Sequence, residues 1–386
     1  MSEKKNNSLV SSVQHGLTIH STELASRGLA ALRAKSEKKL VQQTNYFRFP
    51  EGKSIGKVVV TNRPSLVNRR GWFWSEGAID ARGVIVIPDN EITILSIDDD
   101  VDNFSFLNES NLSSLYGFCL AGNIHFTEWS VLNRMELLEY LELSATEISD
   151  EGLINLESLT KLNYLNLGMT KITDAGLTRL ENLAALTNLD LYETNITDEG
   201  LAHLAHLNNL TRIDLSCTKI TGRGLIYLES LVKLKHLQLA WTQIIDADLI
   251  HIKALAALTS LDLNKTHITD DGLVHLAHLN ELILLDLSDT KTTDVGLGQL
   301  IHLNKLEVLD LRGTPISDAG LFLLKSLASL HRLNISKCSQ ITDTGLSYLT
   351  AFPSISILYL GGNQITDVQL ARFKHVMPHC EVVMFS

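Results

Sequence analysis

The feature that most constrains this chain is a repeat of about 24 residues that runs through residues 138–386. A segment of the form Ile/Thr-Ser/Thr-Asp, or a close variant, recurs ten times; eight of the nine spacings are 24 residues and one is 25. A Leu-x-Leu pair recurs in phase with it, from Leu141/Leu143 to Leu358/Leu360. Self-similarity at such a period is typical of solenoids, in which each unit stacks on the next. The segments end at Asp150, Asp174, Asp198, Gly222, Asp246, Asp270, Asp294, Asp318, Asp343 and Asp367.

The two spacings inside one unit predict a strand followed by a short helix. The leucines of Leu-x-Leu lie on one face of a strand, because successive side chains point to opposite faces. The leucines that follow, three residues apart, indicate a short helix with one apolar face, and the preceding Thr-Asp offers an N-cap oxygen. One unit cannot bury its leucines alone, so we expect the units to stack around a continuous core.

The consensus LxxLxLxxTxITDxGLxxLxxLxx resembles the leucine-rich repeat family over residues 138–386. It is most similar to a bacterial, 24-residue variant of the cysteine-containing subfamily known from F-box ubiquitin-ligase receptors. The resemblance implies an α/β solenoid or horseshoe, with a parallel β-sheet on its concave side and helices on its convex side. Threonine fills the cysteine position from Thr146 to Thr314, followed by Cys338 and Asn363. We expect these hydroxyls to bond backbone groups and to form a ladder between units.

Residues upstream of the repeats predict a small, strand-containing N-terminal cap, because the end units of a solenoid expose apolar faces. Phe118/Leu120 and Leu95/Ile97 indicate degenerate first units. Val58–Val60 and Val84–Ile87 indicate further strands, with the Trp72–Trp74 cluster packed between them.

The two ends of the chain carry their own patterns. Residues 21–41 predict a basic amphipathic helix, which we expect to dock on the cap or to form a tail rather than to lie on a membrane. Val382 and Met384 fall one repeat after Leu358 and Leu360 and predict a last strand that closes the stack. We therefore expect three parts: an N-terminal helix or tail over 1–45, a cap with degenerate repeats over 46–137, and the repeat domain over 138–386.

The side chains that flank the strand leucines point away from the core and form the candidate binding surface. Tyr, Trp and Arg are enriched at interface hot spots, so we expect a partner-binding patch where they gather on the first five strands. Its residues are Tyr140, Tyr164, Met169, Tyr192, Arg212, His236 and Trp241.

A row of acids occupies the position between the two leucines. Carboxylates on neighbouring strands lie ~4.8 Å apart and attract a cationic group, which favours a partner with a basic surface. The alternative is that Leu-Asp-Leu is a structural feature of the repeat, whatever it binds. The acids of this row are Asp190, Asp214, Asp262, Asp286 and Asp310.

Charge and cysteine usage limit the partner and the compartment. The formal net charge is −11, but residues 1–70 carry 13 Lys/Arg and 4 Asp/Glu, leaving 20 and 40 in residues 71–386. An acidic body repels nucleic acid and anionic lipid. No apolar run is long enough to span a membrane, no signal peptide is evident, and the four cysteines are scattered. We expect a cytoplasmic monomer; the alternative is secretion into a host cell by a non-Sec route.

Two consecutive units depart from the consensus. Gly222 replaces the aspartate in one, and in the next Ile245 replaces threonine and Asp248 replaces glycine. Neutral drift explains these changes, or else they shape a local surface for a partner.

Catalytic and metal-binding motifs are absent from the sequence. It contains no phosphate-binding loop, nucleophile elbow, zinc-protease motif or dinucleotide turn. His203, His251 and His275 share one helical position, and His206, His278, His302 and His375 share another; a pair on neighbouring units could reach one zinc, but no cysteine falls nearby. We therefore expect no cofactor, no metal and no enzyme. The favoured function is a non-enzymatic protein-interaction module; the alternatives are a translocated bacterial effector, a ubiquitin-ligase adaptor, or chemistry confined to residues 1–110.

Overall fold

The computed structural model describes residues 46–50, 54–61, 78–82, 84–86, 92–98, 101, 103–120, 122, 125–352 and 354–384. The predicted helix over 21–41 and the Trp72–Trp74 cluster lie outside these residues. The chain divides into two compact units, Met1–Glu147 and Ile148–Ser386, which are described separately.

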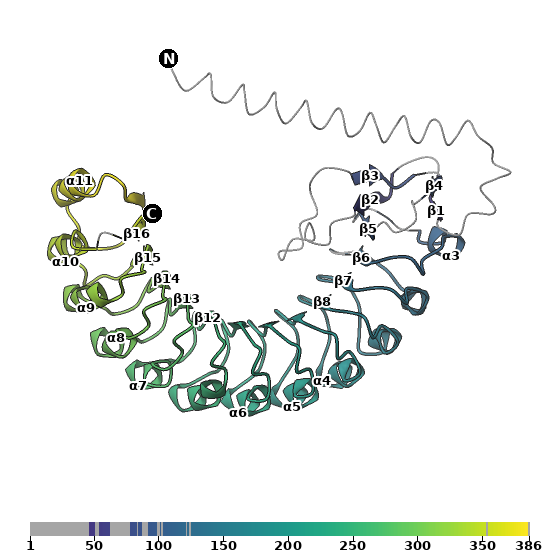
Figure 1. Cartoon of the computed structure of the whole chain (residues 1–386), viewed down its shortest axis with the longest axis horizontal. Helices are drawn as coiled ribbons and strands as arrows, with labels where there is room; N and C mark the ends of the chain where they lie inside the picture. Colours follow the sequence, from purple (N-terminus) through teal and green to yellow (C-terminus); the bar gives the residue numbers. More distant parts are fainter. Residues whose placement is uncertain are drawn as a thin grey trace, which may run out of the picture. The chain divides into compact units, whose positions relative to one another are not determined.

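The second unit is a stack of short parallel strands. Each Leu-x-Leu pair is in register with the next, as Leu165 is with Leu189 and Leu189 with Ile213. Within this unit the strands line the inner side of an arc and the helices its outer side (Figure 1), as the repeat pattern predicts. The strands are β8 (Tyr164–Asn166), β9 (Asn188–Asp190), β10 (Arg212–Asp214), β11 (His236–Gln238), β12 (Ser260–Asp262), β13 (Leu284–Asp286), β14 (Val308–Asp310), β15 (Arg332–Asn334), β16 (Ile357–Leu360) and β17 (Glu381–Met384).

The leucines spaced by three explain why the outer segments are only partly α-helical. A 3₁₀-helix has three residues per turn, so side chains three apart lie above one another. Leu183 and Leu186 donate their N–H groups to the carbonyls of Leu180 and Leu183 at 2.9 Å, and all three side chains are fully buried. The helices are η3 (Gly152–Leu156), α4 (Asp174–Leu177), η4 (Thr178–Leu180), α5 (Asp198–Leu201), η5 (Ala202–Leu204), α6 (Gly222–Leu225), η6 (Ile226–Leu228), η7 (Asp246–Ala254), α7 (Asp270–Leu273), α8 (Asp294–Leu300), α9 (Asp318–Leu323), η8 (Leu324–Ser326), α10 (Asp343–Leu349) and α11 (Asp367–Val376).

The buried threonine column bonds to the backbone as predicted, but within its own unit. Thr170 Oγ1 donates to the Leu167 carbonyl at 2.6 Å, and Thr194 repeats this bond to Leu191. The prediction of a ladder between units through these hydroxyls is therefore wrong, since a carbonyl three residues back is the nearer acceptor. Cys338, in the 25-residue unit, does reach across, from Sγ to the Leu311 carbonyl at 3.0 Å. The extra residue of this unit lies between Cys338 and Ile341, ahead of helix α10.

The ladder between units is formed instead by the recurring Asp and Thr of the helix start. Thr173 donates its N–H to Asp150 Oδ1 at 2.9 Å and its hydroxyl to Asp150 Oδ2 at 2.6 Å. The threonine that begins one helix is thereby bound to the preceding unit. The same pair of bonds is accepted by Asp150, Asp174, Asp198, Asp246, Asp270, Asp294, Asp318 and Asp343.

The two irregular units are consecutive, and the pair of Asp–Thr hydrogen bonds that would join them is missing. Gly222 and Ile245 stand where the acceptor Asp and the donor Thr would be. Asp248 Oδ2 accepts the Ile245 N–H at 2.8 Å, so this amide stays satisfied. A Cβ on Gly222 would overlap the Asp248 carboxyl carbon. Glycine and aspartate have therefore exchanged places, and the carboxylate comes from the later unit.

The first unit contains the predicted cap strands. β2 (Gly56–Thr61) pairs antiparallel with β3 (Ala78–Asp80) and with β5 (Ile92–Ile97), and β1 (Tyr46–Arg48) pairs with β4 (Val84–Val86). The predicted degenerate units are confirmed as strands, because β5, β6 (Gly117–Leu120) and β7 (Tyr140–Glu142) pair in parallel, with Leu95, Phe118 and Leu141 in register.

Aromatic side chains build much of the core of this first unit. Phe104 and Phe126 meet edge to face with ring centroids 4.8 Å apart, and Phe49 contacts Phe106 at 5.7 Å. The segments that carry them include α3 (Phe106–Glu109), while η2 (Trp129–Arg134) supplies Trp129 against Phe126 at 4.7 Å. Ring contacts therefore add to the aliphatic core of the cap, which includes Leu95, Leu120 and Leu141.

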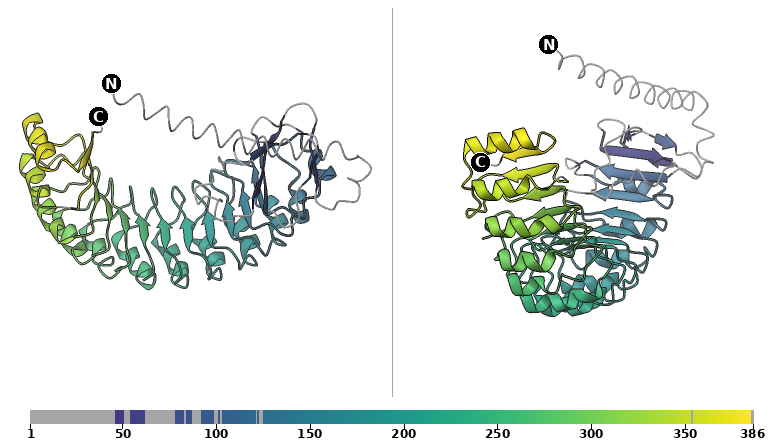
Figure 2. Two further views of the ribbon diagram at one scale, coloured as in Figure 1. Left: turned by 45° about the horizontal axis from the view of Figure 1, so that its top comes forward. Right: turned by 60° about the vertical axis from the view of Figure 1, so that its left-hand side comes forward.

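The predicted closing strand is confirmed as β17. Leu358 is in register with Val382 and Leu360 with Met384. Met384 is 55% exposed, whereas Leu360 in the strand before it is 1% exposed. The last strand therefore covers the core of the preceding unit while its own outer side is not covered by the residues described. Figure 2 shows α10 and α11 stacked beside these strands.

Gly298 lies inside α8, where a helix is weakened by glycine. A Cβ at Gly298 would meet nothing within 4 Å, so Gly298→Ala should raise the free energy of unfolding by about 0.5–1 kcal/mol. Gly296→Ala is the matched control, because its Cβ would overlap Asp270 Oδ1. Urea titrations of both variants test this; a Gly298→Ala protein less stable than wild type would contradict it.

Candidate partner-binding face

The concave face of the second unit is built by the residues between and beside the strand leucines. Leu165, Leu189 and Leu237 are 0–1% exposed, while their neighbours on the opposite face of each strand are half-buried. The alternation follows from the two-residue period of a strand. It leaves three kinds of position open to a partner: the residue before the first leucine, the residue between the leucines, and the residues after the second.

The predicted patch residues do not all share one environment. Met169 and Trp241 are exposed, at 53% and 54%. Tyr140 is only 2% exposed, so the expectation that it lies on an open surface is wrong. It belongs to the first unit, where its strand β7 pairs in parallel with β6. The half-buried members of the patch are Tyr164, Tyr192, Arg212 and His236.

Met169 and Trp241 belong to a row of residues in the left-handed backbone region. One residue per unit adopts this conformation, two positions after the second leucine, with φ between 51° and 72°. Left-handed backbone costs a non-glycine residue roughly 1–2 kcal/mol, and glycine stands there only at Gly313 and Gly362. We call these residues the left-handed row. Its non-glycine members in the second unit are Met169, Glu193, Cys217, Trp241, Lys265, Asp289 and Lys337.

Neighbouring members of the left-handed row and the strands contact one another. The Lys265 ammonium lies 3.6 Å from the centroid of the Trp241 ring, a cation–π contact. Asp289 accepts a 3.0 Å ion pair from Arg312 of the next unit. Arg212 donates to Gln238 at 2.7 Å on the strand beside it. Trp241 and Asp289 of the left-handed row are therefore each held by a residue of the next unit.

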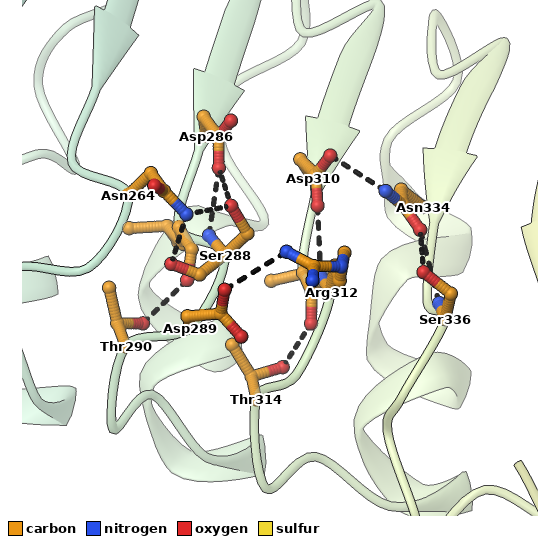
Figure 3. A network of polar contacts seen from close by, with 12 residues as sticks. Asn264, Asp286, Ser288, Asp289, Thr290, Asp310, Arg312, Thr314, Asn334 and Ser336 are labelled. Carbon is orange, nitrogen blue, oxygen red and sulfur yellow. Dashed lines mark hydrogen bonds and ion pairs between the residues drawn. The ribbon is translucent and has the colours of Figure 1, made fainter. Parts of the chain in front are cut away.

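The acidic row has a structural task at the ends of the strands. One carboxylate oxygen of Asp190, Asp214 or Asp262 accepts the N–H two residues on at 2.9 Å. Asp286 also accepts the Ser288 hydroxyl, at 2.5 Å, and Asp310 accepts the Asn334 side-chain amide at 2.8 Å (Figure 3). The structural interpretation of Leu-Asp-Leu thus has a physical basis in one carboxylate oxygen of each aspartate. Binding of a partner by this row would use the other oxygen.

Burial perturbs these carboxyls in one direction. Desolvation raises the pKa of Asp262 and of Asp310 to about 6, and neighbouring carboxylates add to the effect. Desolvation likewise raises the pKa of Asp214 and Asp286. Asp262 and Asp310 are therefore largely ionised at pH 7, at a cost to folding.

Comparison with known proteins agrees with this architecture. Models of the leucine rich repeat match residues 135–156, 158–180, 206–228, 256–316 and 326–349. An internalin of Listeria monocytogenes is 24% identical, with a TM-score of 0.50 over 72% of this chain and 89% of its own. A leucine-rich repeat protein of Leptospira interrogans is 16% identical, with a TM-score of 0.42 over 70% and 84%. A search of curated proteins finds no match.

The chain folds as a leucine-rich repeat solenoid. The structural likeness shows the fold, and leucine-rich repeats typically mediate protein–protein interaction. The narrower subfamily assignment, to a bacterial threonine variant of the cysteine-containing type, stays a prediction.

Two of the repeat histidines, His203 and His251, pair with carboxylates of the preceding unit. His203 Nδ1 lies 2.6 Å from Glu181, and His251 Nδ1 lies 2.7 Å from Glu229. Among the described residues, no group of three or more His, Cys, Asp or Glu side chains is arranged to hold a metal ion. Likewise, no described helix is both long and apolar enough to cross a membrane.

Asp262 gives a pH prediction for the repeat domain. Its folded pKa of about 6 lies above the ordinary 3.8, so the folded state holds more protons than the unfolded state between these values. Its contribution to the free energy of unfolding therefore rises as pH falls through that window. Asp262→Asn should stabilise the protein at pH 7 by on the order of 1 kcal/mol after allowing for solvent screening.

The gain from Asp262→Asn should vanish near pH 4, where the carboxyl is protonated in the folded state. Asparagine keeps the turn, since Asn166 already accepts the Gly168 N–H at 2.8 Å in the same position. Urea titrations at pH 7 and pH 4 make the comparison, with exposed Asp271→Asn as control. An equal effect at both pH values would refute the prediction.

Proposed function

We propose that this chain is a non-enzymatic protein-binding module that holds a protein partner against its concave face. Trp241 carries the proposal. Its indole is 54% exposed and is held in left-handed backbone, where glycine would be unstrained. A bulky side chain kept at a cost to folding supports a role outside folding. The proposed contact residues are Tyr164, Met169, Tyr192, Arg212, His236 and Trp241, with Asp190, Asp214, Asp262, Asp286 and Asp310 beside them.

The cysteines support a reducing compartment for this module. Cys119, Cys217, Cys338 and Cys380 are all free, and disulfides are the rule only in oxidising compartments. We propose that the protein works as a cytoplasmic monomer, with residues 46–137 as its cap and 138–386 as its binding domain. Proteins built from such repeats are generally interaction scaffolds, which favours this function over an enzyme.

The test is substitution of Trp241 after a partner has been captured by proximity labelling with the full chain. Trp241→Ala should weaken binding of the captured protein by about 2 kcal/mol, measured by calorimetry. Phe322→Ala is the matched control: Phe322 is a 47% exposed aromatic on α9, covered by Lys325 at 3.7 Å much as Lys265 covers Trp241. Equal affinities of wild type and Trp241→Ala would sink the proposal.

A further inference from the structure

β11 interrupts the acidic row of the second unit, because Gln238 stands between Asp214 of β10 and Asp262 of β12. The loop after β11 carries exposed Trp241, covered on one side by Lys265. The next three strands each place a carboxylate at the same position, with Asp262 in register with Asp286 and Asp286 with Asp310. The exposed Trp241 ring therefore lies beside three carboxylates in a row. A partner that contacts both would need an apolar group and a positive charge.

The carboxylates keep hydrogen-bonding capacity that the fold does not use. Asp262 and Asp286 each accept backbone N–H groups through Oδ1. Among the described residues, no hydrogen bond reaches Oδ2 of either one, whereas Asp310 Oδ2 accepts Asn334. Arg312 forms an ion pair with Asp289, and its charge lowers the pKa of Asp286 and Asp310 less than burial raises it. Two neighbouring strands thus present carboxylate oxygens of the same charge to which one cationic group can bind.

The residues beside the carboxylates favour a lysine or arginine side chain over a free metal ion as the bound cation. Leu284 and Val308 stand two positions before Asp286 and Asp310, on the same face of their strands, and both are half-buried. Lysine and arginine bury an aliphatic stem while the charged head stays at the polar end. An apolar residue next to an acceptor fits that amphipathic shape, which a hydrated metal ion does not have.

Strand spacing sets the distance between the two contacts. Neighbouring strands lie ~4.8 Å apart, so Asp286, two strands beyond the unit of Trp241, is roughly 10 Å along the stack. An extended peptide rises ~3.3 Å per residue, so about three residues cover that distance. The charge and the spacing are those of an extended peptide with an apolar residue and a basic residue about three positions apart.

We propose that the partner contributes an extended segment with a large apolar residue at Trp241 and a lysine or arginine about three residues away, bound by Asp262, Asp286 and Asp310. The segment runs across the strands, along the stack. This deepens the proposed function and rests on it, since it requires that the concave face binds protein at all.

Selection from a random 12-residue peptide library displayed on phage, against the full-length protein, tests the assignment. Enriched sequences should share an apolar residue and a Lys or Arg about three positions apart. A synthetic copy of an enriched peptide should bind Asp262→Asn/Asp286→Asn at least fivefold more weakly, and the loss should shrink in 0.5 M salt as the attraction is screened. Exposed Asp271→Asn is the charge-matched control and should bind as wild type does.

The outcomes separate the two proposals. Peptides that depend on Trp241 but lack a basic residue, or that ignore the double substitution, overturn the assignment and leave the binding module standing. Peptides insensitive to Trp241→Ala and to the double substitution, or no enrichment over a surface without protein, count against both.

Discussion

Gly222→Asp should destabilise the protein by about 4 kcal/mol, although it restores the consensus residue of the repeat. Its side chain would occupy the volume already filled by the Asp248 carboxyl, so overpacking and like-charge repulsion act together. The reciprocal exchange predicts that the double variant Gly222→Asp/Asp248→Gly recovers most of that loss, because the introduced carboxylate can then accept the Ile245 N–H from the earlier unit. Urea unfolding of the four proteins gives the coupling energy directly.

Gly298→Asp controls for the cost of placing aspartate in a helix, because its side chain meets open space in α8. It should cost less than ~1 kcal/mol. The exchange would not contribute to stability if Gly222→Asp costs no more than Gly298→Asp, or if Asp248→Gly fails to rescue it. Neutral drift would then be the better explanation of the two irregular units.

Asp270→Ala should lower the free energy of unfolding by about 2–3 kcal/mol, because it removes the acceptor of two bonds between units. Asp270 accepts the Thr293 N–H at 2.7 Å and the Thr293 hydroxyl at 2.5 Å. Without this acceptor the Thr293 N–H has no partner at a packed interface. An unpaired amide destabilises the folded state by the full free energy of removing it from water. The control is the next residue in the chain, because Asp271 has the same charge and is exposed.

Asp271→Ala should change stability by less than ~0.5 kcal/mol. The difference between the two adjacent substitutions isolates the ladder from general effects of removing an acid from the first turn of a helix. Equal losses in urea unfolding would mean that the carboxylate acts through the helix dipole and not through the link between units.

The sequence predicts the core of this fold well because its signal is periodic. Leu165 and Leu167 must face inward on a strand, and leucines three apart must share one side of a tight helix; both outcomes depend only on local geometry. The link between Asp150 and Thr173 is harder to predict, since it joins atoms 23 residues apart whose meeting depends on how tightly units stack. A signal for it is present all the same: Gly222 and Ile245 depart from the consensus together, as partners in one contact would.

The candidate face is harder still to predict, because exposure depends on neighbours as well as on position. Tyr140 holds the same place in its unit as Tyr164 and is nevertheless buried. The left-handed backbone at Trp241 is only weakly signalled, since glycine is the usual marker of positive φ and stands at this position only as Gly313 and Gly362, while other units hold Met, Glu, Cys, Lys or Asp. The binding role that we propose for the acids is also hidden, because a Leu-Asp-Leu sequence is the same whether one carboxylate oxygen or both accept hydrogen bonds.

The extra residue of the 25-residue unit indicates where this scaffold accepts new sequence. It falls in the loop between buried Cys338 and buried Ile341, and Thr342 still reaches Asp318 with both bonds intact, at 2.8 and 2.7 Å. The loops that follow the left-handed row therefore absorb a change of length while strand register and helix start stay fixed. For an engineer these loops are grafting sites: a short peptide inserted there would be displayed beside the concave face, in as many copies and at as regular a pitch as the repeat provides.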